Sequence, residues 1–163
     1  MATANRNLSD YNKDFVPNGA DYKIGIVVSE WNENVTFNLL AGAKQALMDN
    51  GVLEKNIHVH YVPGAFELPL GAQMMLKAMF LDGIVAIGCV IQGETKHFDY
   101  VCKAATNGIA KLNLKFERPV SFCLLTDNTL QQSLDRSGGK HGNKGTECAI
   151  ACLKMIDLKR SLF

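Results

Sequence analysis

From Lys23 to the end of the chain, short apolar runs alternate with longer segments whose apolar positions recur every three or four residues. The short runs are rich in Ile and Val and have the length of buried strands. They occupy residues 24–28, 57–62, 84–90 and 120–125. The longer segments predict amphipathic helices over residues 35–50, 67–81 and 97–116, a helical turn after Asp127 and a last helix from about Asn143. Gly51 and Gly83 fall where helix ends and turns favour glycine.

Strands that alternate with helices predict an α/β domain built on a parallel sheet. Right-handed crossovers let the chain wind first one way and then the other, which gives the strand order 2-1-3-4 with helices on both faces. We therefore expect a flavodoxin-like, three-layer α/β/α fold. Residues 1–22 lack this alternation and the apolar stretch of a secretory signal, so they predict an arm or a short extra strand before a single domain over residues 23–163. The glycine-rich residues 137–145 predict a loop between helices.

Charge and composition exclude several classes of function. The formal net charge is +1, so the chain lacks the electrostatic footprint of a nucleic-acid-binding or membrane-surface protein. Five cysteines are an odd number without the paired short spacers of a metal site, so we expect reduced, buried thiols in a cytoplasmic protein. His58 and His60 alternate like a metal pair, but no third ligand accompanies them, and no metal is predicted.

Two loops that follow the first and third strands carry most of the candidate chemistry. They are residues 29–34 and 91–97, and ligands of open α/β sheets bind beyond the carboxyl ends of such strands. The Gly93-Glu94-Thr95 turn ends at a helix start, where free amides and the helix dipole predict an anion site, and phosphate is the expected anion. The alternative is that Gly93 only makes the turn and Thr95 only caps the helix.

His97 lies in the first turn of that helix, where the dipole favours the neutral ring that can take up a proton. A purely structural histidine is the alternative. Trp31 stands outside any apolar periodicity and offers a face on which a planar ligand can stack, or a cap over the sheet edge. Phe66 and Glu67 follow the second strand and can reach the same crevice, although Glu67 also suits the first turn of a helix.

Other candidates are ordinary residues by default. Arg136 and Lys144 flank the glycine-rich segment as surface charges, yet a guanidinium is the natural bidentate partner of a phosphate. Phe122 on the fourth strand is a core residue by default, and the pair Cys148 and Cys152 is expected to pack rather than react.

Four motifs in this order resemble those of the lumazine synthases, over essentially residues 23–163. The motifs are KIGIVV from Lys23, VPGAFE from Val62, GETKHFDYV from Gly93 and GNKG from Gly142. The resemblance implies the penultimate step of riboflavin biosynthesis. In that step a transferase condenses 5-amino-6-(D-ribitylamino)uracil with 3,4-dihydroxy-2-butanone 4-phosphate to 6,7-dimethyl-8-ribityllumazine, without cofactor or metal.

The resemblance also assigns roles to residues. It implies that Trp31 stacks on the pyrimidine, that His97 transfers protons and that Arg136 holds phosphate from a neighbouring subunit. The remaining substrate-binding positions that it implies are Ala65, Phe66, Glu67, Cys89, Val90, Ile91, Gly93, Glu94, Thr95, Phe122 and Lys144. Two positions depart from the common family pattern, because Gln92 replaces a basic residue and Trp31 a phenylalanine, and the wider indole favours tight binding of a finished flavin.

The resemblance further implies self-association into cyclic pentamers, with the N-terminal arm adding a strand to a neighbour. The compact glycine-rich segment resembles that of shell-forming members, which implies an icosahedral shell of sixty subunits, and the resemblance makes riboflavin synthase a candidate partner. The alternative is a non-catalytic flavin or lumazine carrier, or a protein whose shell is its main role, since a fold alone does not establish catalysis.

Overall fold

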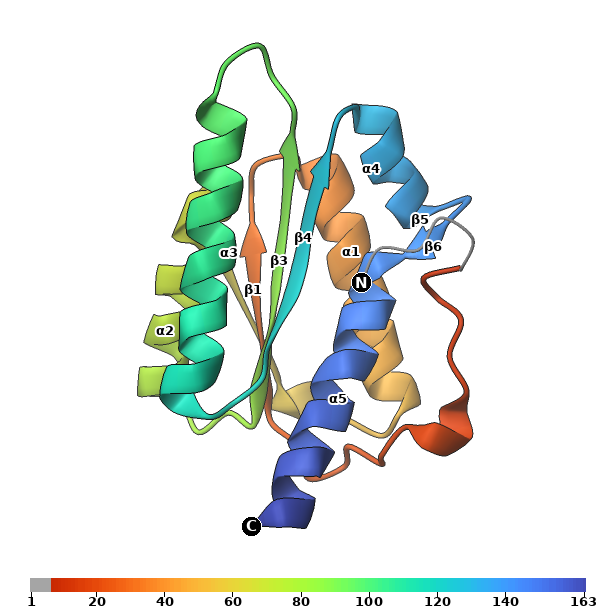
Figure 1. Cartoon of the computed structure of the whole chain (residues 1–163). Helices are drawn as coiled ribbons and strands as arrows, with labels where there is room; N and C mark the ends of the chain where they lie inside the picture. The colour runs from red at the N-terminus through yellow and green to blue at the C-terminus, as the bar shows by residue number, and fades with distance from the viewer. Residues whose placement is uncertain (1–6) are drawn as a thin grey trace.

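A four-stranded parallel sheet forms the centre of the computed structural model, which describes residues 7–163 (Figure 1). The sheet has the order β2-β1-β3-β4, as the sequence predicts. Its strands are β1 (Ile24–Ser29), β2 (Ile57–Val62), β3 (Gly83–Ile91) and β4 (Val120–Asp127). β1 is buried along its whole length and β3 along most of it, which is typical of central parallel strands that are covered on both faces.

Helices cover both faces of the sheet, so the predicted three-layer architecture is confirmed (Figure 1). One face packs against α1 (Glu33–Asp49) and α5 (Lys144–Leu162) around a core that includes Ile26 and Val85. The other face packs against α2 (Leu68–Ala78) and α3 (His97–Phe116) around a core that includes Val27 and Ile84. The short α4 (Leu130–Arg136) follows β4 at the carboxyl edge of the sheet.

Two predicted details differ in the structure, and a third is confirmed. α2 ends at Ala78 rather than at residue 81, because Met79 is extended and Leu81 turns into the core. Gly83 begins β3 instead of forming a turn. A Cβ at this position would press on Cys152 Sγ, so the absence of a side chain allows α5 to pack closely against β3. Gly51 does occupy a left-handed turn, with φ +91°.

The glycine-rich segment is a small hairpin and not the loop that the sequence predicts. β5 (Ser137–Gly139) pairs antiparallel with β6 (Gly142–Asn143). Gly142 allows the tight return because its φ is +81°. α5 follows directly, with Asn143 Oδ1 accepting a hydrogen bond from the Gly145 amide at 2.8 Å.

The described part of the N-terminal segment, residues 7–22, contains a short 3-10 turn, η1 (Lys13–Phe15), and no strand. It stays against its own chain: the Leu8 amide donates to His141 O at 2.7 Å, and the Gly19 amide donates to Asn50 O at 2.8 Å. Tyr22 is buried in the core beside α5. The arm over residues 1–22 stays a prediction, and whether it includes a strand in residues 1–6 lies outside the described residues.

All five cysteines belong to the described residues, and none forms a disulfide. Cys102 is half-buried and the others are buried. Burial raises the pKa of Cys152 to about 12, so this thiol stays protonated and packs as a small apolar group. No helix in the range 7–163 is both long and apolar enough to cross a membrane.

Glycine at two positions lets α1 and α5 approach closely. A Cβ on Gly145 would collide with the backbone of Leu39 in α1, and a Cβ on Gly42 would collide with the Asn143 side chain. By contrast, a Cβ on Gly93 would meet nothing within 4 Å.

We expect Gly145→Ala to destabilise the protein by about 1–3 kcal/mol, because the added methyl forces two rigid backbones apart. The matched control, Gly93→Ala, has room for its methyl group and should unfold like the wild type. Chemical denaturation of both variants measures the difference. Equal midpoints for Gly145→Ala and the wild type would contradict this account of the packing of α1 and α5.

Candidate active site

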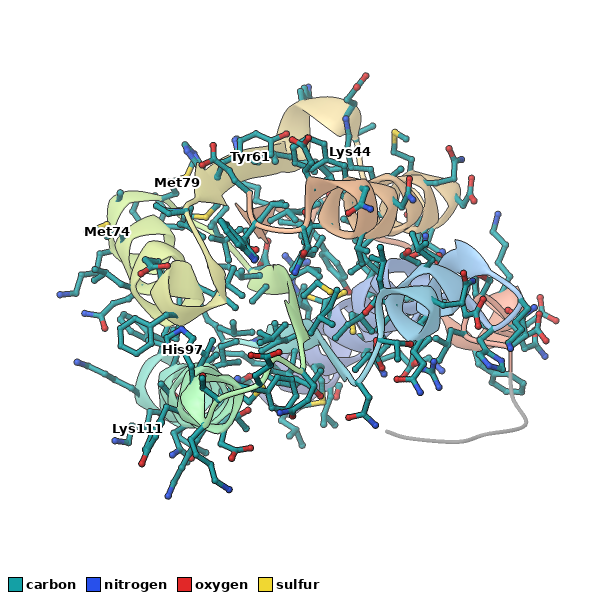
Figure 2. The ribbon with its side chains drawn as sticks, turned by 90° about the horizontal axis from the view of Figure 1, so that it is seen from above. Lys44, Tyr61, Met74, Met79, His97 and Lys111 are labelled. Carbon is teal, nitrogen blue, oxygen red and sulfur yellow. The ribbon has the colours of Figure 1, made fainter. Side chains whose placement is uncertain are left out.

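A hollow of about 750 Å³ opens at the carboxyl ends of β1, β2 and β3, where the sequence predicts the crevice. Its walls come from the segments that follow these three strands and from the first turn of α3. In Figure 2, which looks onto this end of the molecule, His97 lies on the side of α3 that faces α2. The predicted site residues that line the hollow are Trp31, Ala65, Phe66, Glu67, Cys89, Val90, Ile91, Gly93, Thr95 and His97.

Trp31 forms one wall. Its backbone is fixed to the end of β2, because the Glu30 amide donates to Val62 O at 2.8 Å and the Trp31 amide donates to Pro63 O at 3.2 Å. Trp31 as a whole is 72% exposed. An anchored backbone with an uncovered ring provides a rigid apolar platform beside the hollow.

The turn after β2 forms a second wall. Residues Ala65–Glu67 make a 3-10 turn, η3, that leads directly into α2. Ala65 is buried, Glu67 is half-buried, and Phe66 is 60% exposed. Two exposed aromatic rings and one carboxylate therefore face a common space, which suits a flat ligand that carries hydrogen-bond donors.

The end of β3 forms the back of the hollow through Cys89, Val90 and Ile91. The Cys89 thiol donates to the buried Ser133 Oγ at 3.4 Å, and the Ser133 hydroxyl donates to Asp127 Oδ2 at 2.8 Å. Burial is the main cause that raises the pKa of Cys89. A buried, protonated thiol is a poor nucleophile, so Cys89 supplies shape and not covalent chemistry.

Residues 92–96 form the rim between β3 and α3. Gln92 is tied to β4 by its amide, which donates to Asp127 O at 2.9 Å. Within residues 7–163, the amides of Gly93, Glu94 and Thr95 have no hydrogen-bond acceptor. These exposed donors stand directly before the N-terminus of α3, and such an arrangement can hold an anion.

Gly93 has a further property. Its φ is not in the left-handed region, and a Cβ would meet open space, so neither the turn nor the packing of this chain requires glycine there. The alternative that Gly93 only makes the turn is therefore not supported by its geometry. The backbone is instead left bare toward the hollow, where a ligand can approach it closely.

His97 begins α3 and is exposed to the hollow. Its backbone amide donates to Thr95 Oγ1 at 3.4 Å, so the Thr95 hydroxyl does contribute to the helix start, as the alternative interpretation of this residue held. In the described part of the chain, the imidazole ring makes no hydrogen bond or ion pair. The ring is free to exchange a proton with a ligand in the hollow.

Four predicted site residues do not line the hollow of their own chain: Glu94, Phe122, Arg136 and Lys144. Arg136 Nη1 donates to Gln132 O at 2.9 Å, and its Nε lies 4.0 Å from Asp127 Oδ1. Lys144 Nζ pairs with Glu147 Oε1 at 2.9 Å. Phe122 is 36% exposed on the edge strand β4, although the default expectation for it was a core position.

The hollow is also lined by residues that the sequence analysis did not single out: Asn32, Pro63, Gly64, Phe98 and Val101. Helical periodicity was a usable signal for Val101, which lies one turn after His97 on the same face of α3. Asn32 follows Trp31, but its role depends on a backbone conformation that no sequence pattern reports. Among residues 7–163, no group of three or more His, Cys, Asp or Glu side chains could hold a metal ion. His58 and His60 therefore have no third ligand in this part of the chain.

Comparison with known proteins gives a consistent assignment. The family model described as 6,7-dimethyl-8-ribityllumazine synthase matches residues 21–160. A relative from Flavobacterium johnsoniae is 55% identical over 98% of this chain and 84% of its own length. Relatives from Christiangramia forsetii and Phocaeicola vulgatus are 55% and 53% identical over 98% and 99% of this chain and 96% of their own lengths, and all three are named 6,7-dimethyl-8-ribityllumazine synthase. The chain therefore belongs to the 6,7-dimethyl-8-ribityllumazine synthase family, as its motifs indicate.

Proposed function

We propose that this protein is a transferase of riboflavin biosynthesis that forms 6,7-dimethyl-8-ribityllumazine from 5-amino-6-(D-ribitylamino)uracil and 3,4-dihydroxy-2-butanone 4-phosphate, with release of phosphate and water. One observation within the family assignment carries the proposal. A single hollow joins an exposed indole, the backbone of Gly93 and Thr95, whose amides have no acceptor in the described chain, and a histidine whose ring makes no hydrogen bond there. A carrier of finished flavin would use the indole but has no need of the other two, so the non-catalytic alternative is not favoured.

The pyrimidine is placed on the Trp31 face, with Phe66 and the end of β3 enclosing it. Glu67 lies beside this position and can accept hydrogen bonds from the ribityl hydroxyls. The phosphate is placed on the amides of Gly93, Glu94 and Thr95, where the dipole of α3 adds a favourable field. The two ends of the hollow thus carry different binding groups: aromatic rings for the pyrimidine and backbone amides for the phosphate.

The reaction begins when the amine attacks the ketone and water leaves to form an imine. Removal of a proton from the adjacent sugar carbon then allows phosphate to leave, and His97 at the rim is the base for this step. Ring closure with loss of a second water gives the lumazine. Much of the rate enhancement comes from holding two substrates in contact, and the rest from stabilising the departing phosphate.

A neighbouring subunit completes the site. Arg136, Phe122 and Lys144 do not line their own hollow, and we assign them to the hollow of the next subunit in a cyclic pentamer. The flank formed by β2 and α2 supports such an assembly, because β2 is an edge strand and carries the exposed Tyr61, while α2 carries the exposed Met74 (Figure 2). Leu70 of α2 is exposed as well. Burial of this flank between subunits removes apolar surface from water.

Twelve pentamers in an icosahedral shell remain the favoured state, since the segment before α5 is a short hairpin without an insertion. Riboflavin synthase remains a candidate partner of that shell. The cytoplasmic location is supported by the free thiols, which suit a reducing compartment.

His97→Gln and His97→Ala are expected to lower turnover roughly ten- to a thousandfold, because the group that takes up the proton is removed. Steady-state rates across a pH series measure this loss, and light scattering verifies that assembly is intact. His141→Gln is the control, because His141 lies in the β5–β6 turn outside the hollow. Wild-type rates for both His97 variants over the whole pH range would exclude His97 as the base.

Arg136→Ala is expected to weaken the phosphorylated substrate by roughly tenfold or more and to leave the pyrimidine nearly unaffected, because a charged contact to phosphate is removed. Separate titrations of the two ligands test this selectivity. Arg118→Ala removes the same charge at the opposite end of the sheet and serves as the control. Co-assembly of Arg136→Ala chains with His97→Ala chains tests whether two subunits share one site. If they do, about a quarter of the sites in an equal mixture combine an intact His97 with an intact Arg136 from the next chain, and activity should return to that extent. No recovery would place Arg136 in its own subunit's site.

The assembly is decided by light scattering at neutral pH. A sixty-subunit shell has a mass of about sixty times the 17.9 kDa of the chain, whereas a pentamer has five times that mass. We expect the larger particle. A species at five chain masses would show that the short hairpin before α5 does not determine shell formation.

A further inference from the structure

Asn32 has an unusual backbone for a residue that is not glycine. It lies between Trp31 and the start of α1 with φ 61° and ψ 47°, in the left-handed region. Asparagine tolerates this region better than most residues, but the conformation still costs free energy and persists only where the surroundings impose it. Within residues 7–163 the other non-glycine residue of this kind is Glu117, at the far end of α3.

The Asn32 side chain does not perform the function that its position favours. Asparagine before a helix normally accepts a hydrogen bond from an amide of the first turn, yet the Asn32 side chain makes no capping bond to α1. The helix start is held by the backbone alone, with the amides of Val35 and Thr36 donating to Asn32 O at 2.9 and 3.0 Å. Asn32 Nδ2 donates instead to Cys89 O at 3.0 Å, across the hollow's edge to β3.

This hydrogen bond connects the segment after β1 to β3 beyond the end of their strand pairing. Pairing between β1 and β3 ends at Val28 and Ile87. Beyond that point, the Asn32 amide provides the next connection between the two strand ends. The segment before it is otherwise held by β2 and by itself, through the amides of Glu30 and Trp31 and through the Ser29 hydroxyl, which donates to Trp31 O at 3.1 Å.

We propose that Asn32 is a positioning residue that fixes the Trp31 platform against the end of β3 and so sets the width of the slot for a planar ring. The inference rests on the proposed function for the identity of that ring, a substituted aminouracil. Asn32 acts through its neighbours Trp31 and Cys89, both of which line the hollow. The phosphate end of the hollow lies on the amides of residues 93–95 and does not depend on the bond between Asn32 and Cys89.

Two substitutions separate the bond from the backbone conformation. Asn32→Asp keeps the size and the tolerance of positive φ, but its carboxylate cannot donate to the Cys89 carbonyl. Asn32→Gly relieves the backbone and removes the bond. The matched control is Asn38→Asp, which deletes a bond of the same kind on the exposed face of α1, from Asn38 Nδ2 to Asn34 O at 2.9 Å.

The experiment titrates the assembled, full-length protein with the ribitylaminouracil and, separately, with inorganic phosphate. Fluorescence of Trp31, the only tryptophan, reports pyrimidine binding, and calorimetry reports phosphate binding. We expect both Asn32 variants to raise the Kd of the pyrimidine about five- to fiftyfold, which is the range for loss of a partly buried hydrogen bond that orients a binding surface. The Kd of phosphate should change less than about twofold, and KM for the pyrimidine should rise more than kcat falls.

Wild-type pyrimidine binding by Asn32→Gly, or equal weakening of both ligands, would overturn the proposal. If Asn32→Asp fails to assemble, the comparison between Asn32→Gly and Asn38→Asp still decides it. Wild-type protein that binds phosphate but no pyrimidine would overturn the proposed function and this inference together, whereas a defect confined to the variants supports the inference alone.

Discussion

Burial of β1 and β3 on both faces is the constraint on which the rest of this structure depends. Two central strands with continuous apolar sequences can be covered only if helices lie on both sides, and the crossovers that provide these helices make all strands parallel. Parallel strands end at one edge of the sheet. The polar residues that follow each strand therefore meet there, although they are up to 66 positions apart between Trp31 and His97.

The chemistry of the hollow arises from groups that the fold leaves unsatisfied. The rim amides before α3 have no acceptor, the Trp31 indole has no cover, and the His97 ring has no partner among the described residues. These groups are exposed, so water solvates them in the free protein, and a ligand in the hollow can replace that water. The Asn32 side chain, by contrast, does have a partner. It makes no capping bond to α1 and instead donates to Cys89 O, which connects two walls of the same hollow.

The proposed pentamer links catalysis to assembly, because Arg136 and Lys144 do not line the hollow of their own chain. α1 and α5 meet so closely that glycine is needed at the contact, which fixes the start of α5 and the β5–β6 hairpin relative to the sheet. Arg136 and Lys144, on either side of this hairpin, are thereby held away from their own hollow. In the proposed pentamer the same rigidity presents them to the next subunit, so a substrate phosphate depends on two chains.

The sequence by itself determined the strand order, both layers of helices, the edge at which the hollow opens and most of the residues that line it. These follow from periodicity and from the rule for parallel sheets, which depend on local patterns and chain connectivity alone. Only the tertiary structure decided that residues 137–145 form a hairpin, that Gly93 is bare without being conformationally required, and that Asn32 reaches Cys89. The reason is physical: each of these depends on contacts or backbone angles set by distant segments, which leave no periodic trace in the residues themselves.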